Sequence, residues 1–166
     1  MNKWIFIHPF AYVVKIAKSI GFIKGLKTIF EFKLLKKGYF YDTIEDMSAQ
    51  QNETIAKAWF EAFNAHNLEK LLALYHEQAK HYSPKLKIRK PETNGLVSGK
   101  NALRAWWKDA FERLPSLHYE VTDLTANENR IFMEYIRKVE NEEEMMVAEL
   151  LEIENGLIVF SKVYHG

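Results

Sequence analysis

Several residue types and motifs are missing from this chain of 166 residues. It contains no cysteine, which excludes disulfides, thiolate metal sites and a cysteine nucleophile, and which fits the reducing cytoplasm. It has neither a glycine-rich phosphate loop nor a Gly-x-Ser-x-Gly sequence, so nucleotide-binding proteins and serine hydrolases are not indicated. What is abundant is apolar: 48% of the residues are hydrophobic and 14% are aromatic. These values and the length favour one globular domain with a substantial core.

The net charge of +1 conceals two oppositely charged parts. Residues 1–40 contain eight lysines and one acidic residue, Glu31, which gives +7. The remainder has 15 basic and 21 acidic residues, which gives −6. We therefore expect a basic extension over residues 1–47 and a separate domain over residues 48–166. The negative balance of the domain argues against nucleic acid as a partner.

The basic extension is apolar, aromatic and rich in lysine. It is a poor signal peptide, because His8 and Pro9 interrupt its apolar run and no small-x-small cleavage site follows. It does not predict a spanning helix, because every stretch of about 18 residues contains a lysine. We expect one or two helices that either dock on the protein or lie on a membrane surface through residues 1–40. Docking is favoured slightly, since the lysines do not keep to one helix face.

The rest of the chain changes from a helical to an alternating pattern. Up to Arg113 it predicts three helices, one short strand and one loop: a helix from Ser48 or Asn52 to about Ala65, a short helix capped by Asn67 with His76 at its end, a strand at Ala79–Ser83, an exposed loop at residues 85–97, and a helix at Asn101–Arg113. After Pro115, four alternating segments predict an antiparallel meander, with Asn155-Gly156 as a hairpin turn. We therefore expect an α+β fold in which three helices pack against a curved, mainly antiparallel sheet.

Three phrases carry a resemblance to a known family: AWFEAFNAHNLEKLLALYHEQAKHYSP, GLVSGKNALRAWW and LEIENGLIVFSKVYHG. Over about residues 50–166 the chain resembles the SnoaL-like (polyketide-cyclase-like) branch of the nuclear transport factor 2 superfamily. The resemblance implies a cone-shaped scaffold, commonly dimeric, that serves ketosteroid isomerases, limonene-epoxide hydrolases, polyketide cyclases and non-catalytic partners. One scaffold with many chemistries specifies the fold better than the function.

Three histidines lie close together in the sequence, at positions 66, 76 and 81. Their spacings of ten and five do not place two ligands on one helix face, so we assign no metal. We expect His66 and His76 to be structural. His81 alternates with Ala79 and Ser83 on the face that should line a cavity, and the resemblance implies pocket-lining polar residues at positions like His81 and Ser83. A satisfied interior histidine is the competing interpretation.

The meander supplies further candidate site residues. Tyr135 and Arg137 face inward where, by resemblance, relatives carry a catalytic Arg-x-Asp pair, so that acid-plus-arginine arrangement is missing. Glu149 interrupts an apolar inward stripe, which predicts either a raised pKa suited to acid/base chemistry or an ion pair with Arg137. Ser161 and His165 share a face of the last strand, and His165 lies either at the pocket rim or frayed at the terminus. An inward Asp123 is an open alternative.

Two functional hypotheses follow, and both involve a small hydrophobic ligand without a cofactor. Trp59, Phe63 and Trp106 would form pocket walls, although residues at such spacing also serve as core. In an enzyme, His81 or Glu149 would move a proton while Tyr135 and Arg137 stabilise an oxyanion. In a non-catalytic module, the chain would only bind a ligand or dimerise. The candidate surface for a homodimer is the sheet face that carries Phe132, Ile136, Leu150 and Phe160.

Overall fold

The computed structural model describes residues 39–165, with side chains from Ser48 onward. The chain divides into residues 1–43 and residues 44–166, and the following account concerns the second unit. The docking and membrane hypotheses for residues 1–40 concern positions outside the described part. No described helix is both long and apolar enough to cross a lipid bilayer.

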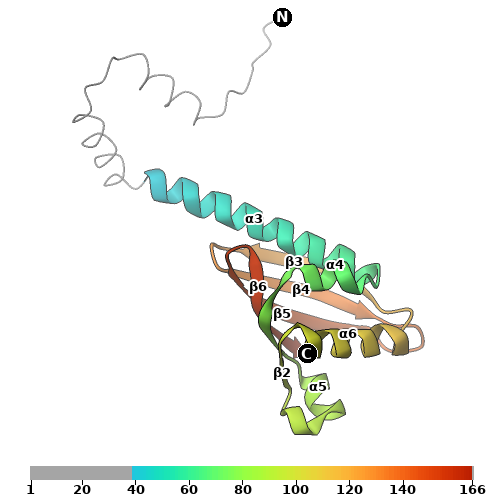
Figure 1. The fold of residues 1–166 in the computed structure, drawn as a ribbon. Coiled ribbons are helices and arrows are strands. Elements are labelled where there is room, and N and C mark those ends of the chain that lie inside the picture. Colours follow the sequence, from blue (N-terminus) through green and yellow to red (C-terminus); the bar gives the residue numbers. More distant parts are fainter. Residues whose placement is uncertain (1–38, 166) are drawn as a thin grey trace, which may run out of the picture. The chain divides into compact units, whose positions relative to one another are not determined.

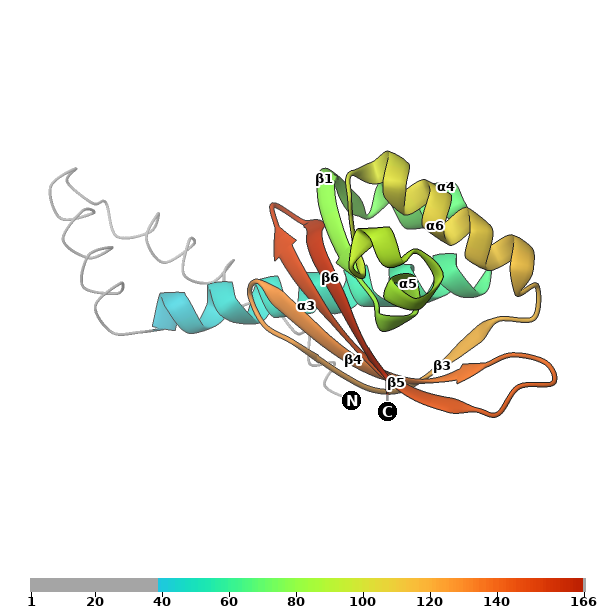
Figure 2. The same cartoon turned by 90° about the horizontal axis from the view of Figure 1, so that it is seen from below.

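The second unit consists of helices packed on one side of a curved sheet (Figures 1 and 2). Its helices and strands, in chain order, are α3 (Tyr39–Asn64), α4 (Leu68–Ala73), β1 (Tyr75–Tyr82), α5 (Pro84–Arg89), the 3-10 helix η1 (Pro91–Thr93), β2 (Leu96–Ser98), α6 (Lys100–Arg113), β3 (His118–Ala126), β4 (Arg130–Lys138), β5 (Met145–Glu154) and β6 (Leu157–His165). The six strands have the order β2-β1-β6-β5-β4-β3. Among the described strand pairs, only β1 and β6 run parallel. The predicted α+β class and mainly antiparallel sheet are confirmed.

The predicted hairpin between β5 and β6 is also confirmed. Asn155 and Gly156 have φ angles of 52° and 75°, so both lie in the left-handed region. Two successive residues with positive φ are the signature of a tight turn whose twist matches that of the flanking strands. The turn sets the register of the hairpin, with Glu154 opposite Leu157. Along β5 the side chains alternate, so Glu149 lies on the same buried face as Leu151 and Ile153.

The start of the first helix differs from its prediction. α3 is already helical at Tyr39, so neither Ser48 nor Asn52 is its cap, and the predicted boundary at residues 47–48 falls inside a helix. Asn52 is only 3% exposed, and its Nδ2 donates to the carbonyl of Asn127 at 2.7 Å. A buried amide needs such a partner, and this one ties the helix to the β3–β4 turn.

The prediction of three helices and an exposed loop at residues 85–97 is wrong. The described part has four α-helices, because α5 occupies the start of that segment. Pro84 is well suited to a first helical position, and Leu86 is fully buried, which anchors the short helix. Gly95 then reverses the chain at φ +86°, where a Cβ would lie 2.9 Å from the Tyr82 ring. The reversal lets β2 pair with β1, a sixth strand that the pattern did not indicate.

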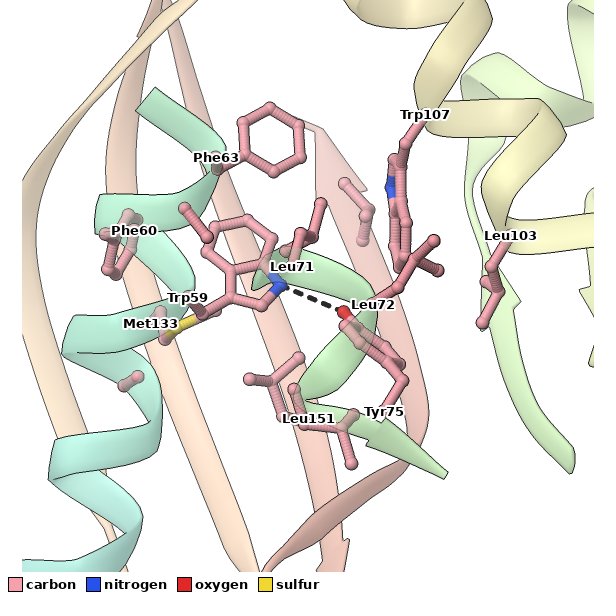
Figure 3. Packing of buried hydrophobic residues seen from close by; sticks show 14 of the residues in the cluster. Trp59, Phe60, Phe63, Leu71, Leu72, Tyr75, Leu103, Trp107, Met133 and Leu151 are labelled. Carbon is pink, nitrogen blue, oxygen red and sulfur yellow. Dashed lines mark hydrogen bonds between the residues drawn. The ribbon is translucent and has the colours of Figure 1, made fainter. Parts of the chain in front are cut away.

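Aromatic rings dominate the packing between the helices and the sheet (Figure 3). Trp59 of α3 is 1% exposed and stacks against Phe63 with ring centroids 4.9 Å apart. Its indole Nε1 donates to the hydroxyl of Tyr75 on β1 at 2.9 Å. Tyr75 in turn contacts Trp107 of α6, with ring centroids 4.8 Å apart. These contacts join α3, β1 and α6 and so position the walls of the cavity described next.

Candidate functional site

A cavity of about 340 Å³ lies on the inner side of the sheet, bounded by side chains of α3, α5 and α6. Nine of the ten residues that the sequence nominated line it: Trp59, Phe63, His81, Ser83, Trp106, Tyr135, Arg137, Glu149 and His165. The size suits a small organic molecule, and the aromatic walls suit an apolar one. The structure therefore brings the nominated residues together around one space.

Ser161, the tenth nominated residue, contacts the pocket through His81. The two side chains share a hydrogen bond of 2.7 Å between His81 Nδ1 and Ser161 Oγ. Both are buried, and the edge of the His81 imidazole meets Trp107 at a centroid distance of 5.7 Å. Burial lowers the pKa of His81 to about 4, since the charged imidazolium would lose its hydration. His81 is therefore neutral at neutral pH.

Glu149 is the most unusual group in the pocket wall, with only 2% of its surface exposed. Its Oε2 accepts a hydrogen bond of 2.9 Å from the hydroxyl of Tyr135. Its Oε1 has no hydrogen-bond partner among the described residues. Burial raises the pKa of Glu149 to about 7, and the hydroxyls of Tyr135 and Ser161 oppose part of that rise. Such a carboxyl is half ionised near neutral pH and can both accept and return a proton.

The alternative ion pair between Glu149 and Arg137 does not form. Arg137 Nη1 instead donates to Oε2 of Glu142, at 2.7 Å, in the turn between β4 and β5. That hydrogen bond lowers the pKa of Glu142. Arg137 is buried and lines the pocket near its mouth, so its charge is compensated by the turn and not by Glu149.

Tyrosines form a larger part of the site than the sequence indicated. Tyr119 of β3 lines the pocket and packs against Tyr135, with ring centroids 4.4 Å apart. Burial, followed by the nearby charge of Glu149, raises the pKa of Tyr75, Tyr119 and Tyr135, so all three remain neutral phenols. The inward position of Tyr119 could have been deduced from strand alternation, because it lies two residues after the buried Leu117 and so shares its face.

Asp123, which the sequence left open as an inward residue, does not face the pocket. The β3–β4 register shifts between Val121 and Asp123, and such a bulge breaks the simple alternation of a strand. Asp123 is exposed as a result. Glu149 and Glu142 are the acidic residues that line the pocket among the described positions.

Three cations at the mouth were also missed: Lys85 and Arg89 of α5, and Arg113 at the end of α6. The first two were assigned to an exposed loop. The signal that could have found them is their i, i+4 spacing directly after Pro84, because that spacing places two side chains on one face of a helix. His165 also reaches the mouth, where burial, then Lys85 and Arg137, lower its pKa.

His66 and His76, which the sequence analysis expected to be structural, lie outside the pocket lining. His66 has a φ of 49° at the end of α3, its Nε2 lies 2.9 Å from the carbonyl oxygen of Leu117, and its ring stacks on Phe111. These contacts agree with a structural role. His76 lies exposed within β1, not at the end of α4, so its predicted position was wrong. Within residues 39–165 no three His, Asp or Glu side chains form a group that could hold a metal ion.

Comparison with known proteins agrees with the fold. The chain belongs to the SnoaL-like domain family, whose model matches residues 56–161. A SnoaL-like protein of unknown function from Burkholderia thailandensis is 21% identical, with 70% of this chain and 95% of that chain covered and a TM-score of 0.64. A proposed ketosteroid isomerase from Kribbella flavida is 18% identical, with 71% of this chain and 79% of that chain covered and a TM-score of 0.59.

A third similar structure is a proposed polyketide cyclase from Sinorhizobium meliloti. It is 14% identical, with 67% of this chain and 94% of that chain covered and a TM-score of 0.57. At these identities the similarity establishes the cone-shaped fold and not the activity. No curated protein sequence matches this chain. The function must therefore be argued from the pocket itself.

Proposed function

We propose that the pocket binds a small hydrophobic molecule and that Glu149 transfers a proton to or from it without a cofactor. The reaction class is that of isomerases, cyclases and hydrolases that use general acid/base chemistry. The observation that carries the proposal is the state of Glu149: it lines the pocket, it is buried, and one of its carboxylate oxygens has no partner among the described residues. A pKa of about 7 suits proton transfer in both directions near neutral pH.

The surrounding groups divide the remaining tasks. Oε1 of Glu149 is the atom that takes the proton, because Oε2 is held by the Tyr135 hydroxyl. His81 is a poor base at neutral pH with its pKa near 4, and it serves as a neutral hydrogen-bonding group. The indole and phenyl walls, Trp59, Phe63 and Trp106 among them, hold the apolar body of the ligand and exclude water.

The non-catalytic alternative has its own support. Arg137 is already engaged by Glu142, so its guanidinium is partly neutralised before any ligand arrives. The hydroxyl of Tyr135 likewise already donates a hydrogen bond to Glu149. Two groups that could stabilise an oxyanion thus have partners in the protein, which favours binding without turnover.

A proton-exchange experiment separates the two functions. The protein is incubated in D₂O with a panel of cyclic and aryl ketones, and the loss of each α-proton signal is followed by ¹H NMR. An enzyme should accelerate exchange of at least one ketone, and Glu149→Gln should reduce the rate by about 100-fold or more. Glu154→Gln, at an exposed position on the same strand, should leave it unchanged. Binding of a ketone without Glu149-dependent exchange would leave the non-catalytic function.

We also propose a homodimer through the outer face of the sheet. Phe132 and Met146 are 39% and 51% exposed there, on adjacent strands. Large apolar side chains exposed on one face of a sheet favour association with a second surface. Light scattering of the full chain should give twice the monomer mass, and Phe132→Lys should shift it toward the monomer. A monomeric wild type would refute this proposal.

A further inference from the structure

The mouth of the pocket is lined by more positive than negative charge. Lys85, Arg89, Arg113 and Arg137 line it, and Glu142 is the acidic residue beside them. The cations come from three separate elements, α5, α6 and β4, so the fold, and not one run of sequence, gathers them. The inner wall, in contrast, is aromatic and aliphatic apart from the His81, Ser83 and Glu149 side chains and the tyrosine hydroxyls.

Carboxylates pair with three of these four cations. Arg137 is held by Glu142 at 2.7 Å. Arg89 and Arg113 share the single carboxylate of Asp109, at 3.7 Å and 3.4 Å. Among the described side chains no carboxylate lies within ion-pair distance of Lys85. Among the described residues the mouth therefore retains Lys85 as a cation without an ion-pair partner, and Asp109 compensates Arg89 and Arg113 only in part.

The unpaired position is electrostatically unfavourable for the protein alone. Lys85 is partly buried, and burial, followed by the charges of Arg137 and Arg113, lowers its pKa. The attraction of Glu142 opposes this lowering; it is weaker than the repulsion from Arg137 and stronger than that from Arg113. Like charges held close together at the opening of a low-dielectric cavity concentrate a positive potential there, and that potential favours an anion.

We propose that the ligand is an amphipathic organic monoanion: its apolar body lies against the aromatic inner wall, and its carboxylate, or an equivalent oxyanion, lies at the mouth beside Lys85 and Arg137. The proposal rests on the proposed binding function of the pocket and adds the charge class of the ligand. One unpaired cation matches one negative charge, which favours a carboxylate over a phosphate dianion. The anionic end also fixes the direction in which the molecule enters, with its apolar end toward Glu149.

Two fluorescent probes of nearly identical shape test the charge directly. The anion 8-anilinonaphthalene-1-sulfonate and the neutral N-phenyl-1-naphthylamine share an aryl-amine body and differ in the sulfonate. For the full chain at low ionic strength, Lys85→Gln should weaken binding of the anion about five-fold or more and leave that of the neutral probe unchanged. Salt at about 0.5 M should remove most of that difference, since exposed charges are screened.

Lys87→Gln is the matched control, because Lys87 lies two residues further along α5, is exposed and does not line the pocket. Both affinities should match those of the wild type. The site of binding is read from the indole N–H signals of Trp106 and Trp107, which line the pocket.

The outcomes distinguish this proposal from the proposed function. If neither probe shifts the two indole signals, the pocket does not bind such molecules and the proposed function fails. If both probes shift them but Lys85→Gln affects the two probes equally, the pocket binds and the anion proposal is overturned. If Lys87→Gln weakens binding of the anionic probe as much as Lys85→Gln does, the attraction is a general surface effect, and the anion proposal is also overturned.

Discussion

The inner end of the pocket and its mouth hold polar groups in opposite ways. At the inner end, Glu149 and His81 are buried and have pKa values shifted toward their neutral forms, to about 7 and about 4. At the mouth, Glu142 has its pKa lowered by Arg137 and is held in its charged form. Desolvation sets the pKa shifts at the inner end. At the mouth, pairing with Arg137 sets the pKa shift of Glu142, while burial is still the first cause for Lys85 and His165.

This difference separates the two tasks of a binding pocket. A buried carboxyl such as Glu149 can exchange protons with an apolar molecule, because desolvation raises its pKa toward neutral pH, whereas the same effect moves the pKa of His81 away from neutral pH. Charged groups at an opening act on the approach and orientation of a ligand and contribute little to folding. Changes at the inner end should therefore alter stability and its pH dependence, whereas changes at the mouth should alter binding.

The largest expected effect is at the innermost aromatic residue, Trp59, whose ring and hydrogen bond to Tyr75 are seen in Figure 3. Trp59→Ala should lower the free energy of unfolding by about 3–5 kcal/mol, measured by urea denaturation, because it opens a cavity and leaves the Tyr75 hydroxyl without this donor. Ile88→Ala is the comparison at the mouth, because Ile88 is 77% exposed. This substitution should change the free energy of unfolding by less than about 0.5 kcal/mol. Equal losses of stability in the two variants would refute the proposed difference between the inner end and the mouth.

The next effect is a pH dependence that comes from Glu149. Its pKa is 4.5 when unperturbed, as in the unfolded chain, and about 7 in the fold, so between these values the unfolded state releases a proton that the folded state keeps. Rising pH therefore destabilises the wild type relative to Glu149→Gln, by about 3 kcal/mol in total between pH 4 and pH 8. Denaturation of both proteins at several pH values measures the difference.

Glu154→Gln is the control for this titration, since Glu154 is exposed on the same strand. Its stability should keep a nearly constant offset from the wild type across the range. Curves for the wild type and Glu149→Gln that run parallel from pH 4 to pH 8 would show that Glu149 titrates normally. The acid/base proposal would then lose its basis.

A smaller effect is expected from the hydrogen bond within the inner end. Tyr135→Phe removes the donor to Oε2 of Glu149 and preserves the ring. Since that bond favours the ionised carboxylate, its loss should move the pKa of Glu149 further above 7, and should cost about 1–2 kcal/mol of stability. NMR titration of ¹³C-labelled glutamate measures the pKa. An unchanged or lower pKa would contradict the assigned hydrogen bond.

The inner end of the pocket could be predicted from the sequence to a larger extent than the mouth. The alternation of β4 and β5 was enough to place Tyr135, Arg137 and Glu149 inward, because each successive side chain of a paired strand points to the opposite face. The resemblance supplied the cone. The partner of Arg137 could not be deduced, because Glu142 belongs to a turn in which Asn141 adopts a φ of 63°.

The mouth was the least predictable part of the molecule. Its cations depend on α5, a six-residue helix in which apolar and basic residues alternate with a period of two, so the pattern does not indicate a helix. The burial of Leu86 holds this helix in place. Tertiary packing decides such short elements more than local propensity does. Asp109 also joins the mouth only because α5 and α6 approach each other in the fold, through its contact with Arg89.

The smallest expected effect on stability is at Asp109, the carboxylate shared by Arg89 and Arg113. Its side chain is 43% exposed, so Asp109→Asn should cost less than about 1 kcal/mol in urea denaturation. The same change removes a negative charge beside the mouth and releases two guanidinium groups. Binding of 8-anilinonaphthalene-1-sulfonate should therefore strengthen about two- to three-fold at low salt, with a steeper dependence on ionic strength.

Glu112→Gln provides the control for Asp109→Asn, because Glu112 pairs with Lys108 on the exposed side of α6 and does not line the pocket. It also removes one negative charge from the same helix, so a general charge effect would strengthen binding equally in both variants. A gain confined to Asp109→Asn would locate the attraction at the mouth. A stability loss above about 2 kcal/mol in Asp109→Asn would instead mean that the mouth charges hold α5 against α6, and the separation between folding and binding would break at this residue.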